Sequence, residues 1–276
     1  MDFLGNHFIY NGVDSIKYGL IFVNAGGEEF LGLCGSPTTN TVFNRQTNKT
    51  SIIGDDYSEA KLSFELAVIN ETGLPYSPSE LRKIKRWLFS QSDYQKLYIS
   101  RIDDPDSYEV TSSGRLGTYL NCRFINPSAV ISGGGTVGYS FSVECDGAFA
   151  WQDPTIKTFT SKDITSAGII LNVDSDYSGY TYPRVDIKVA GGKEFSLCNT
   201  TDSPERITKF KCRDGDNDNA LKGIMTINSN TNFVSGDNYD RFVDQNFPRL
   251  LNGDNTIKIT GNIEEIKFTW VNRRFL

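Results

Sequence analysis

Few residues of this chain are of the types that carry hydrolytic or metal chemistry. His7 is the single histidine among 276 residues. A Ser-His-Asp triad would have to use this residue, and a zinc site of several histidines is disfavoured. The five cysteines are an odd number without a C-x-x-C pair, which favours reduced, mostly buried side chains. No G-x-S-x-G or H-E-x-x-H motif occurs. We therefore predict that the protein is not an enzyme and has no catalytic residue, cofactor or metal site.

Two acidic clusters resemble the start of a calcium-binding loop. The segment 174–179 reads DSDYSG, but Val185 stands where the loop needs its twelfth-position glutamate. The cluster that begins at Asp214 has Met225 at that position. Polar turns account for both clusters. A surface cation at the Asp174 or the Asp214 cluster stays open as an alternative.

Three glycines match the spacing of the dinucleotide fingerprint, in which a tight turn and the helix that follows hold a pyrophosphate. They are Gly133, Gly135 and Gly138. Residues 139–145 then alternate between apolar and polar types, which is typical of a half-buried strand and not of a helix. We predict a hairpin loop here and no nucleotide site.

One segment, residues 77–89, is predicted to be a helix. It begins with S-P-S-E, a capping box with proline at the first helical position, and continues with apolar residues at helical spacing. Its other face carries four cations: Arg82, Lys83, Lys85 and Arg86. They are either a phosphate-binding patch or a solvated face, and the acidic chain favours the solvated face.

Most of the remaining chain has the alternation of antiparallel strands, for example over 185–189 and 266–270. We predict a mainly β protein of two domains, 1–152 and 158–276, with the boundary near 151–160. The net charges of −5 for 1–152 and −1 for 153–276 leave no basic domain, so we expect no specific nucleic-acid binding. Residues 35–56 are polar and poorly periodic, and we expect a long excursion from the first domain.

Short motifs occur at both ends and in the middle of the chain. At the N-terminus an aromatic-Asn-Gly, a Ser and a Tyr-Gly follow one another, carried by Tyr10, Asn11, Gly12, Ser15, Tyr18 and Gly19. In the middle, Tyr182 and Pro183 begin a Tyr-Pro-x-aliphatic-x-aliphatic run. Near the C-terminus an N-x-F-P-x-L-x-x-G-x-N-x-I ending is carried by Asn246, Phe247, Pro248, Gly253 and Asn255. In order and spacing these motifs resemble the distal tail protein (Dit) family of long-tailed, non-contractile bacteriophages (siphoviruses), in which the Tyr-Pro run starts the strand that opens the second domain.

This resemblance implies a structural role at the phage tail tip, or baseplate. The N-terminal belt domain, a β-barrel or sandwich with one α-helix, would form a homohexameric ring, and a galectin-like β-sandwich would follow it. The implied partners are further copies of the chain, the tail tube protein, the tape-measure protein, the tail-associated baseplate protein and receptor-binding proteins. The matching residues would specify fold and assembly. The protein would belong to the virion and be assembled in the bacterial host cytoplasm.

A second hypothesis is a glycan-binding module for receptor recognition at the tail tip. Tyr177, Tyr180 and Tyr182 lie near one another in the sequence and could stack on a sugar ring, although such tyrosines more often fill a core or an interface. No apolar run approaches the ~20 residues of a membrane span, and the first residues lack a signal peptide's pattern.

Overall fold

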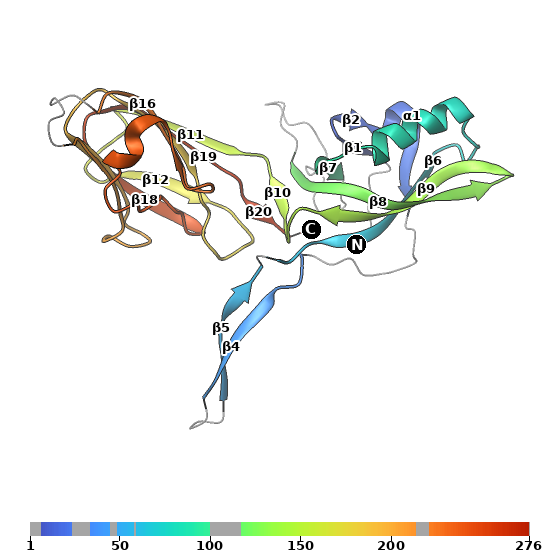
Figure 1. Cartoon of the computed structure of the whole chain (residues 1–276), viewed down its shortest axis with the longest axis horizontal. Helices are drawn as coiled ribbons and strands as arrows, with labels where there is room; N and C mark the ends of the chain where they lie inside the picture. The colour runs from blue at the N-terminus through green and yellow to red at the C-terminus, as the bar shows by residue number, and fades with distance from the viewer. Residues whose placement is uncertain are drawn as a thin grey trace. The chain divides into compact units, whose positions relative to one another are not determined.

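The computed structural model describes residues 7–23, 34–44, 49–57, 59–99, 117–213 and 221–275. The described part is mainly β and contains one α-helix (Figure 1), which confirms the predicted fold class. The chain divides into two compact units, Met1–Asp153 with Arg274–Leu276, and Pro154–Arg273. Two differences from the expected domains follow: residues 154–157 belong to the second unit, and the last three residues belong to the first.

The last residues join the first unit through contacts with the segment before the boundary. Arg274 Nη2 donates a hydrogen bond of 3.0 Å to Gln152 Oε1. The Phe275 ring lies 5.9 Å, centroid to centroid, from Phe149. The chain therefore leaves the first unit at Asp153 and returns to it at Arg274.

The first unit is built on one antiparallel sheet with the strand order β2-β1-β7-β8-β9-β6-β3; β10 pairs with β8, and β20 pairs with β10. The strands are β1 (Phe8–Tyr10), β2 (Val13–Asp14), β3 (Leu20–Val23), β6 (Ser63–Asn70), β7 (Gln95–Ile99), β8 (Thr118–Ser132), β9 (Gly135–Cys145), β10 (Ala150–Gln152) and β20 (Arg273–Arg274). A 3-10 helix, η1 (Ser15–Tyr18), follows β2.

The helix α1 (Pro78–Phe89) coincides with the predicted segment. Ser77 Oγ accepts a hydrogen bond of 3.4 Å from the Glu80 backbone N–H, and Glu80 Oε2 accepts one of 2.9 Å from the Ser77 N–H. Both halves of the capping box are therefore present.

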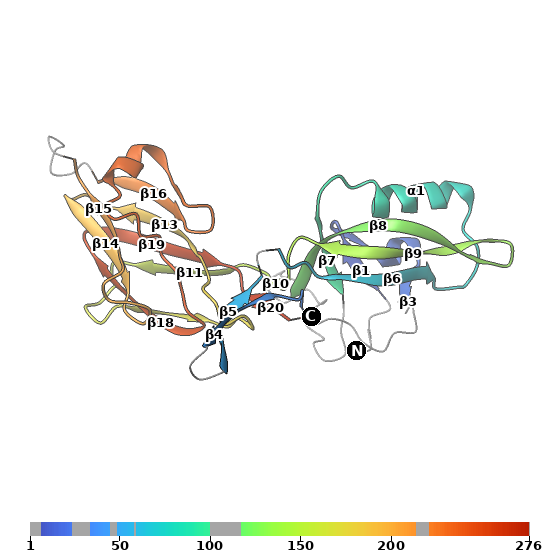
Figure 2. The same ribbon diagram turned by 60° about the horizontal axis from the view of Figure 1, so that its bottom comes forward.

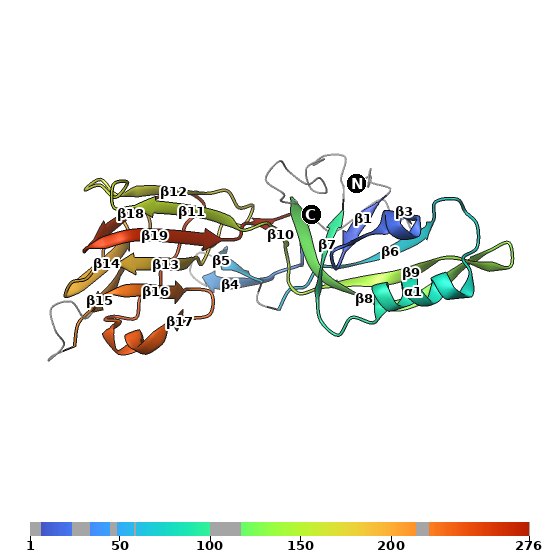
Figure 3. The same cartoon turned by 90° about the horizontal axis from the view of Figure 1, so that it is seen from above.

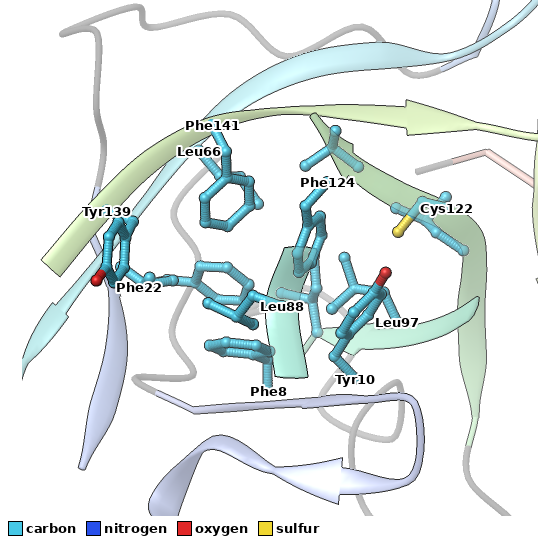
Figure 4. Close-up of a cluster of buried hydrophobic side chains, with 14 of the residues drawn as sticks. Phe8, Tyr10, Phe22, Leu66, Leu88, Leu97, Cys122, Phe124, Tyr139 and Phe141 are labelled. Carbon is cyan, nitrogen blue, oxygen red and sulfur yellow. The ribbon is translucent and has the colours of Figure 1, made fainter. Parts of the chain in front are cut away.

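The buried face of α1 packs on the sheet (Figures 2 and 3) through Ile84, Trp87 and Leu88. The Trp87 ring stacks against Phe8 at 5.7 Å between centroids, and its Nε1–H donates a hydrogen bond of 3.0 Å to the carbonyl of Tyr10. Figure 4 shows the aromatic core of this unit. The apolar face of the helix is thus buried against residues about 80 positions earlier in the chain.

The strands β8 and β9 form a long hairpin whose turn contains the glycine motif. Gly133 and Gly134 have φ of 59° and 80°, as a type I′ turn requires. A Cβ at Gly138 would lie 2.0 Å from the carbonyl oxygen of Val68 on β6, so only glycine fits there. The predicted hairpin is confirmed.

The second unit contains two antiparallel sheets, of order β11-β19-β13-β16-β17 and β12-β18-β14-β15 (Figure 3). The strands are β11 (Thr155–Thr160), β12 (Ile169–Val173), β13 (Arg184–Val189), β14 (Glu194–Asn199), β15 (Ile207–Lys211), β16 (Gly223–Asn228), β17 (Phe233–Val234), β18 (Gly253–Thr260) and β19 (Ile263–Trp270), with a 3-10 helix, η3 (Gly236–Arg241). Side chains from both sheets share one buried core, which is the expected β-sandwich.

Candidate assembly surfaces

The N-terminal motif residues shape the turns at the start of the first unit. Asn11 and Gly12 have φ of 50° and 70° and form the turn between β1 and β2. Ser15 is fully buried, and its Oγ accepts a hydrogen bond of 3.0 Å from the Phe8 N–H. Gly19 ends η1 with φ of 60°.

Two aromatic members of the same motif hold α1 and the segment before it. The Tyr18 ring lies 5.0 Å from the Trp87 ring, and the Tyr18 carbonyl accepts a hydrogen bond of 2.7 Å from Tyr76 Oη. Tyr10 is fully buried and lies 4.2 Å from the Phe124 ring. Burial, followed by the neighbouring Cys122, raises the pKa of Tyr10 well above its ordinary value. Tyr10 is therefore part of the core of the first unit, and Tyr18 is a partly buried residue that packs against it.

The C-terminal motif organises the loop that leads into β18. Asn255 is fully buried. Its Nδ2 donates to the carbonyls of Leu251 and Gly253 at 2.8 and 3.0 Å, while its Oδ1 accepts from the Leu251 N–H and from Asn199 Nδ2, both at 2.8 Å. Gly253 has φ of 89° at the first position of the strand.

The other three members of the C-terminal motif lie in this loop. The carbonyl of Asn246 accepts a hydrogen bond of 2.6 Å from Thr208 Oγ1, and that of Phe247 accepts one of 3.3 Å from Arg206 Nη2. Phe247 and Pro248 line a narrow pocket of about 20 Å³, a volume that holds a water molecule and no larger ligand.

Beside this loop lies an ion pair that the sequence does not reveal. Arg249 Nε and Nη2 donate to the two carboxylate oxygens of Asp202 at 2.8 and 3.2 Å, and Tyr180 Oη donates to the same carboxylate at 3.1 Å. Burial alone would raise the pKa of Asp202, but the hydrogen bond and charge of Arg249 and the hydrogen bond of Tyr180 outweigh it and hold the pKa below its ordinary value.

The three tyrosines considered for sugar stacking do not form one platform. The Arg249 guanidinium covers the Tyr180 ring at 3.9 Å from its centroid, and the Arg273 guanidinium lies 4.5 Å from that of Tyr177. Tyr182 is the exposed member, at 42%. Tyr182 and Pro183 come directly before β13, which is the third strand of the second unit along the chain.

Two paired strands, 38–44 and 49–56, lie in the segment that was expected to be a poorly periodic excursion. The strands β4 (Thr38–Asn44) and β5 (Lys49–Asp56) make a two-stranded sheet of their own (Figure 1). Their side chains are exposed on both faces wherever they are described, so no alternation of apolar and polar residues was needed to form the ribbon. Four of the exposed side chains are large and apolar: Val42, Phe43, Ile52 and Ile53, from 52% to 71% exposed.

The acidic cluster at 174–179 is a turn tied to the end of the chain. The Asp176 N–H donates to the Arg273 carbonyl at 2.9 Å, and Ser175 Oγ donates to the same carbonyl at 3.2 Å. Within the described ranges, no three His, Cys, Asp or Glu side chains are placed to hold a metal ion. The Asp214 cluster lies outside the described residues. Among those described, no helix is long and apolar enough to cross a membrane.

Comparison with known proteins supplies the family. Residues 3–147 match the family described as phage tail protein N-terminal domain, and residues 149–270 match phage tail C-terminal domain. The chain belongs to this phage tail protein family. No curated protein matches the sequence.

The fold of this tail protein is similar to that of the Dit protein of phage SPP1, with a TM-score of 0.63 and 12% identity over 96% of this chain and 98% of that one. That Dit protein is described as a paradigm of the hub adsorption apparatus in phages that infect Gram-positive bacteria. A chain of the activated phage P2 baseplate with Ca aligns with a TM-score of 0.48 and 9% identity, over 98% of this chain and 99% of that one. The resemblance to the distal tail protein family is confirmed, and the chain is a structural component of a phage tail.

Proposed function

We propose that this tail protein is the hub at the tip of a long, non-contractile tail. Six copies close a ring that joins the tail tube and the tape-measure protein to the tail-associated baseplate protein and the receptor-binding proteins. The family assignment and the Dit-like fold support this role. The observation that carries the ring is the exposed hairpin of β4 and β5.

The hairpin has the properties of an arm that needs a partner. An isolated two-stranded ribbon is marginally stable in water, and this ribbon pairs with no other described strand. Val42 and Phe43 are consecutive on β4, so this strand places one large apolar side chain on each face. On β5, Ile52 pairs with Thr41, and Ile53 lies where the register of the ribbon shifts. Burying one such side chain contributes about 1.5–3 kcal/mol.

A contact of this kind closes a ring when the arm of one copy docks on a different surface of the next. Such heterologous interfaces generate rings if the rotation between neighbouring copies closes. The arm could add its strands to a sheet edge or cover an apolar patch of the neighbour. Either contact would bury the four apolar side chains and stabilise the ribbon.

The ring can be tested with the purified full chain. Negative-stain images should show six-fold rings with a central channel, and light scattering should give the mass of six copies. The double variant Val42→Asp/Ile52→Asp should leave smaller species that remain folded, because neither side chain is buried in the single chain. Ile224→Asp is the matched control, because Ile224 is 76% exposed but lies on β16.

Two results would contradict the proposal. One is a strictly monomeric wild-type protein that also fails to bind any tube or baseplate protein. The other is a ring that tolerates both aspartates. Sugar-competable binding of the full chain on a glycan array, without ring formation, would favour the glycan-binding alternative.

A further inference from the structure

A groove of about 630 Å³ lies between α1 and the hairpin of β8 and β9. Arg82, Lys85 and Arg86 line it on the helix side. They recur one turn apart, at i, i+3 and i+4, and therefore share one helix face. Pro127, at a bulge in β8, and Tyr139, on β9, line the opposite side. The groove thus combines a cationic rim with an apolar floor, and its volume falls within the usual range for ligand sites.

The cations of this groove lie close together on one helix, and no described acidic side chain forms an ion pair with them. Residues 1–152 have a net charge of −5 and contain 12 basic side chains, of which four lie on α1. No residue within the described ranges forms an ion pair with Arg82, Lys85 or Arg86. Glu80, the nearest acid in the helix, is engaged in the capping box. Like charges one helical turn apart repel each other, and an anionic partner would relieve that repulsion.

Tyr139 gives the groove a second and independent feature. Its side chain is 3% exposed, yet its hydroxyl has no hydrogen-bond partner among the residues that the structure describes. In Figure 4 the hydroxyl points away from the other labelled side chains of the core. Phe89 packs edge-on against the ring at 5.5 Å, and Lys85 Nζ lies 5.9 Å from its centroid. Burial raises the pKa of Tyr139, so the group stays a protonated donor.

A buried hydroxyl without an acceptor costs stability, and such a group in a folded protein calls for an explanation. A ligand that brings an acceptor into the groove would supply the missing bond. The cations around it select a negatively charged acceptor. A carboxylate fits both requirements, because it accepts from a hydroxyl and pairs with the forked guanidinium of arginine.

We propose that this groove binds an acidic peptide segment of another tail protein. A carboxylate of the segment accepts a hydrogen bond from Tyr139 Oη and pairs with Arg82 or Arg86, while an apolar side chain beside it packs against Phe89 and Pro127. A peptide is favoured over nucleic acid because its few charges suit three cations on an acidic unit, and because the floor of the groove is apolar. The inference adds the chemistry of one partner to the hub and does not depend on the ring.

The test measures binding of a fluorescein-labelled octapeptide, Glu-Glu-Phe-Gly repeated twice, to the full chain by fluorescence anisotropy. We expect Tyr139→Phe to weaken binding about tenfold, as the loss of one charge-assisted hydrogen bond predicts. Its melting temperature should be equal or higher, because an unpartnered buried hydroxyl is removed. Arg82→Gln/Arg86→Gln should abolish binding. Lys83→Gln, with its charge change on the same helix but outside the groove lining, is the matched control and should bind as the wild type does.

Several outcomes would overturn the inference. They are unchanged affinity in Tyr139→Phe, equal binding of the peptide with Gln in place of Glu, and tighter binding of a 12-nucleotide single-stranded DNA than of the peptide. Negative-stain images of the same samples separate this inference from the ring. Rings lost in Arg82→Gln/Arg86→Gln would make the groove a contact between copies and would also overturn it. Absence of rings in the wild type would count against the proposed hub and leave the peptide result standing.

Discussion

Single polar side chains decide the local structure of the motif loops. Asn255 has no exposed surface, and its amide connects the Leu251 and Gly253 backbone to the start of β18. A residue of this kind satisfies backbone groups that the loop would otherwise bury without partners. The C-terminal motif therefore specifies a loop geometry.

We expect Asn255→Ala to lower the free energy of unfolding by about 2–4 kcal/mol, because the loop's buried N–H and carbonyls lose their partners. Urea denaturation measures this change. Asn172→Ala is the control: the Asn172 side chain donates an exposed hydrogen bond to Asp254, and its loss should cost less than about 0.5 kcal/mol. Equal effects of the two substitutions would refute a role for Asn255 in the loop.

The ion pair of Asp202 and Arg249 predicts a dependence of stability on pH. The folded state holds the pKa of Asp202 below its ordinary value, so the carboxylate stabilises the fold above the unfolded pKa of about 4. That contribution is lost as the pH falls through the lower, folded-state pKa.

We therefore expect Asp202→Asn to cost about 2 kcal/mol near pH 7 and progressively less below about pH 4. Denaturation at a series of pH values measures the difference between the two proteins. Glu205→Gln, a change of the exposed acid three residues away, is the control. A cost for Asp202→Asn that stays constant down to pH 2 would contradict the argument.

At the scale of elements, strands and helix differ in how well the sequence predicts them. The helix at 78–89 is predictable because its cap and its apolar spacing are local. The strand at 139–145 is predictable because one of its faces is buried and the other is not. The described side chains of β4 and β5 are exposed on both faces of the ribbon, so these strands leave no periodic signal in the sequence.

The groove of α1 could not be predicted for a different reason. Its cations are visible in the sequence, but Tyr139 comes from a strand about 50 positions later, and its unpartnered hydroxyl is a property of packing. The pair of Asp202 and Arg249 likewise joins residues 47 positions apart. Local sequence patterns carry no information about contacts between residues so far apart in the chain.

The capping box predicts the cost of weakening α1. Ser77→Ala removes the side chain that accepts from the Glu80 N–H, and we expect a loss of about 1 kcal/mol in the free energy of unfolding. Ser79→Ala, two positions later in the first turn, is the control and should cost a few tenths at most. Urea denaturation compares them. A larger effect at Ser79 would show that the cap does not limit the stability of the helix.

At the scale of the whole molecule, each unit has its own buried core. Phe141 is buried among the first set of side chains and Phe268 among the second. A domain with its own core can unfold as its own cooperative unit. The free energy of unfolding of each unit therefore depends on its own core.

We expect scanning calorimetry of the full chain to resolve two transitions. Phe141→Ala should lower one midpoint and Phe268→Ala the other, each through a loss of about 3–5 kcal/mol. Each variant serves as the control for the other. A single transition that both substitutions lower equally would show that the units unfold together.

Because residues near the C-terminus return to the first unit, the second unit is connected to the first at both of its ends. Because the chain leaves the first unit at Asp153 and re-enters it at Arg274, the sandwich is an insertion held at both of its ends. A single cut in one connection would leave it covalently attached, and a truncation after Asp153 would also remove Arg274 and its bond to Gln152. The two junctions define a cassette, which can be exchanged for another domain with neighbouring termini while the N-terminal unit keeps its own sheet.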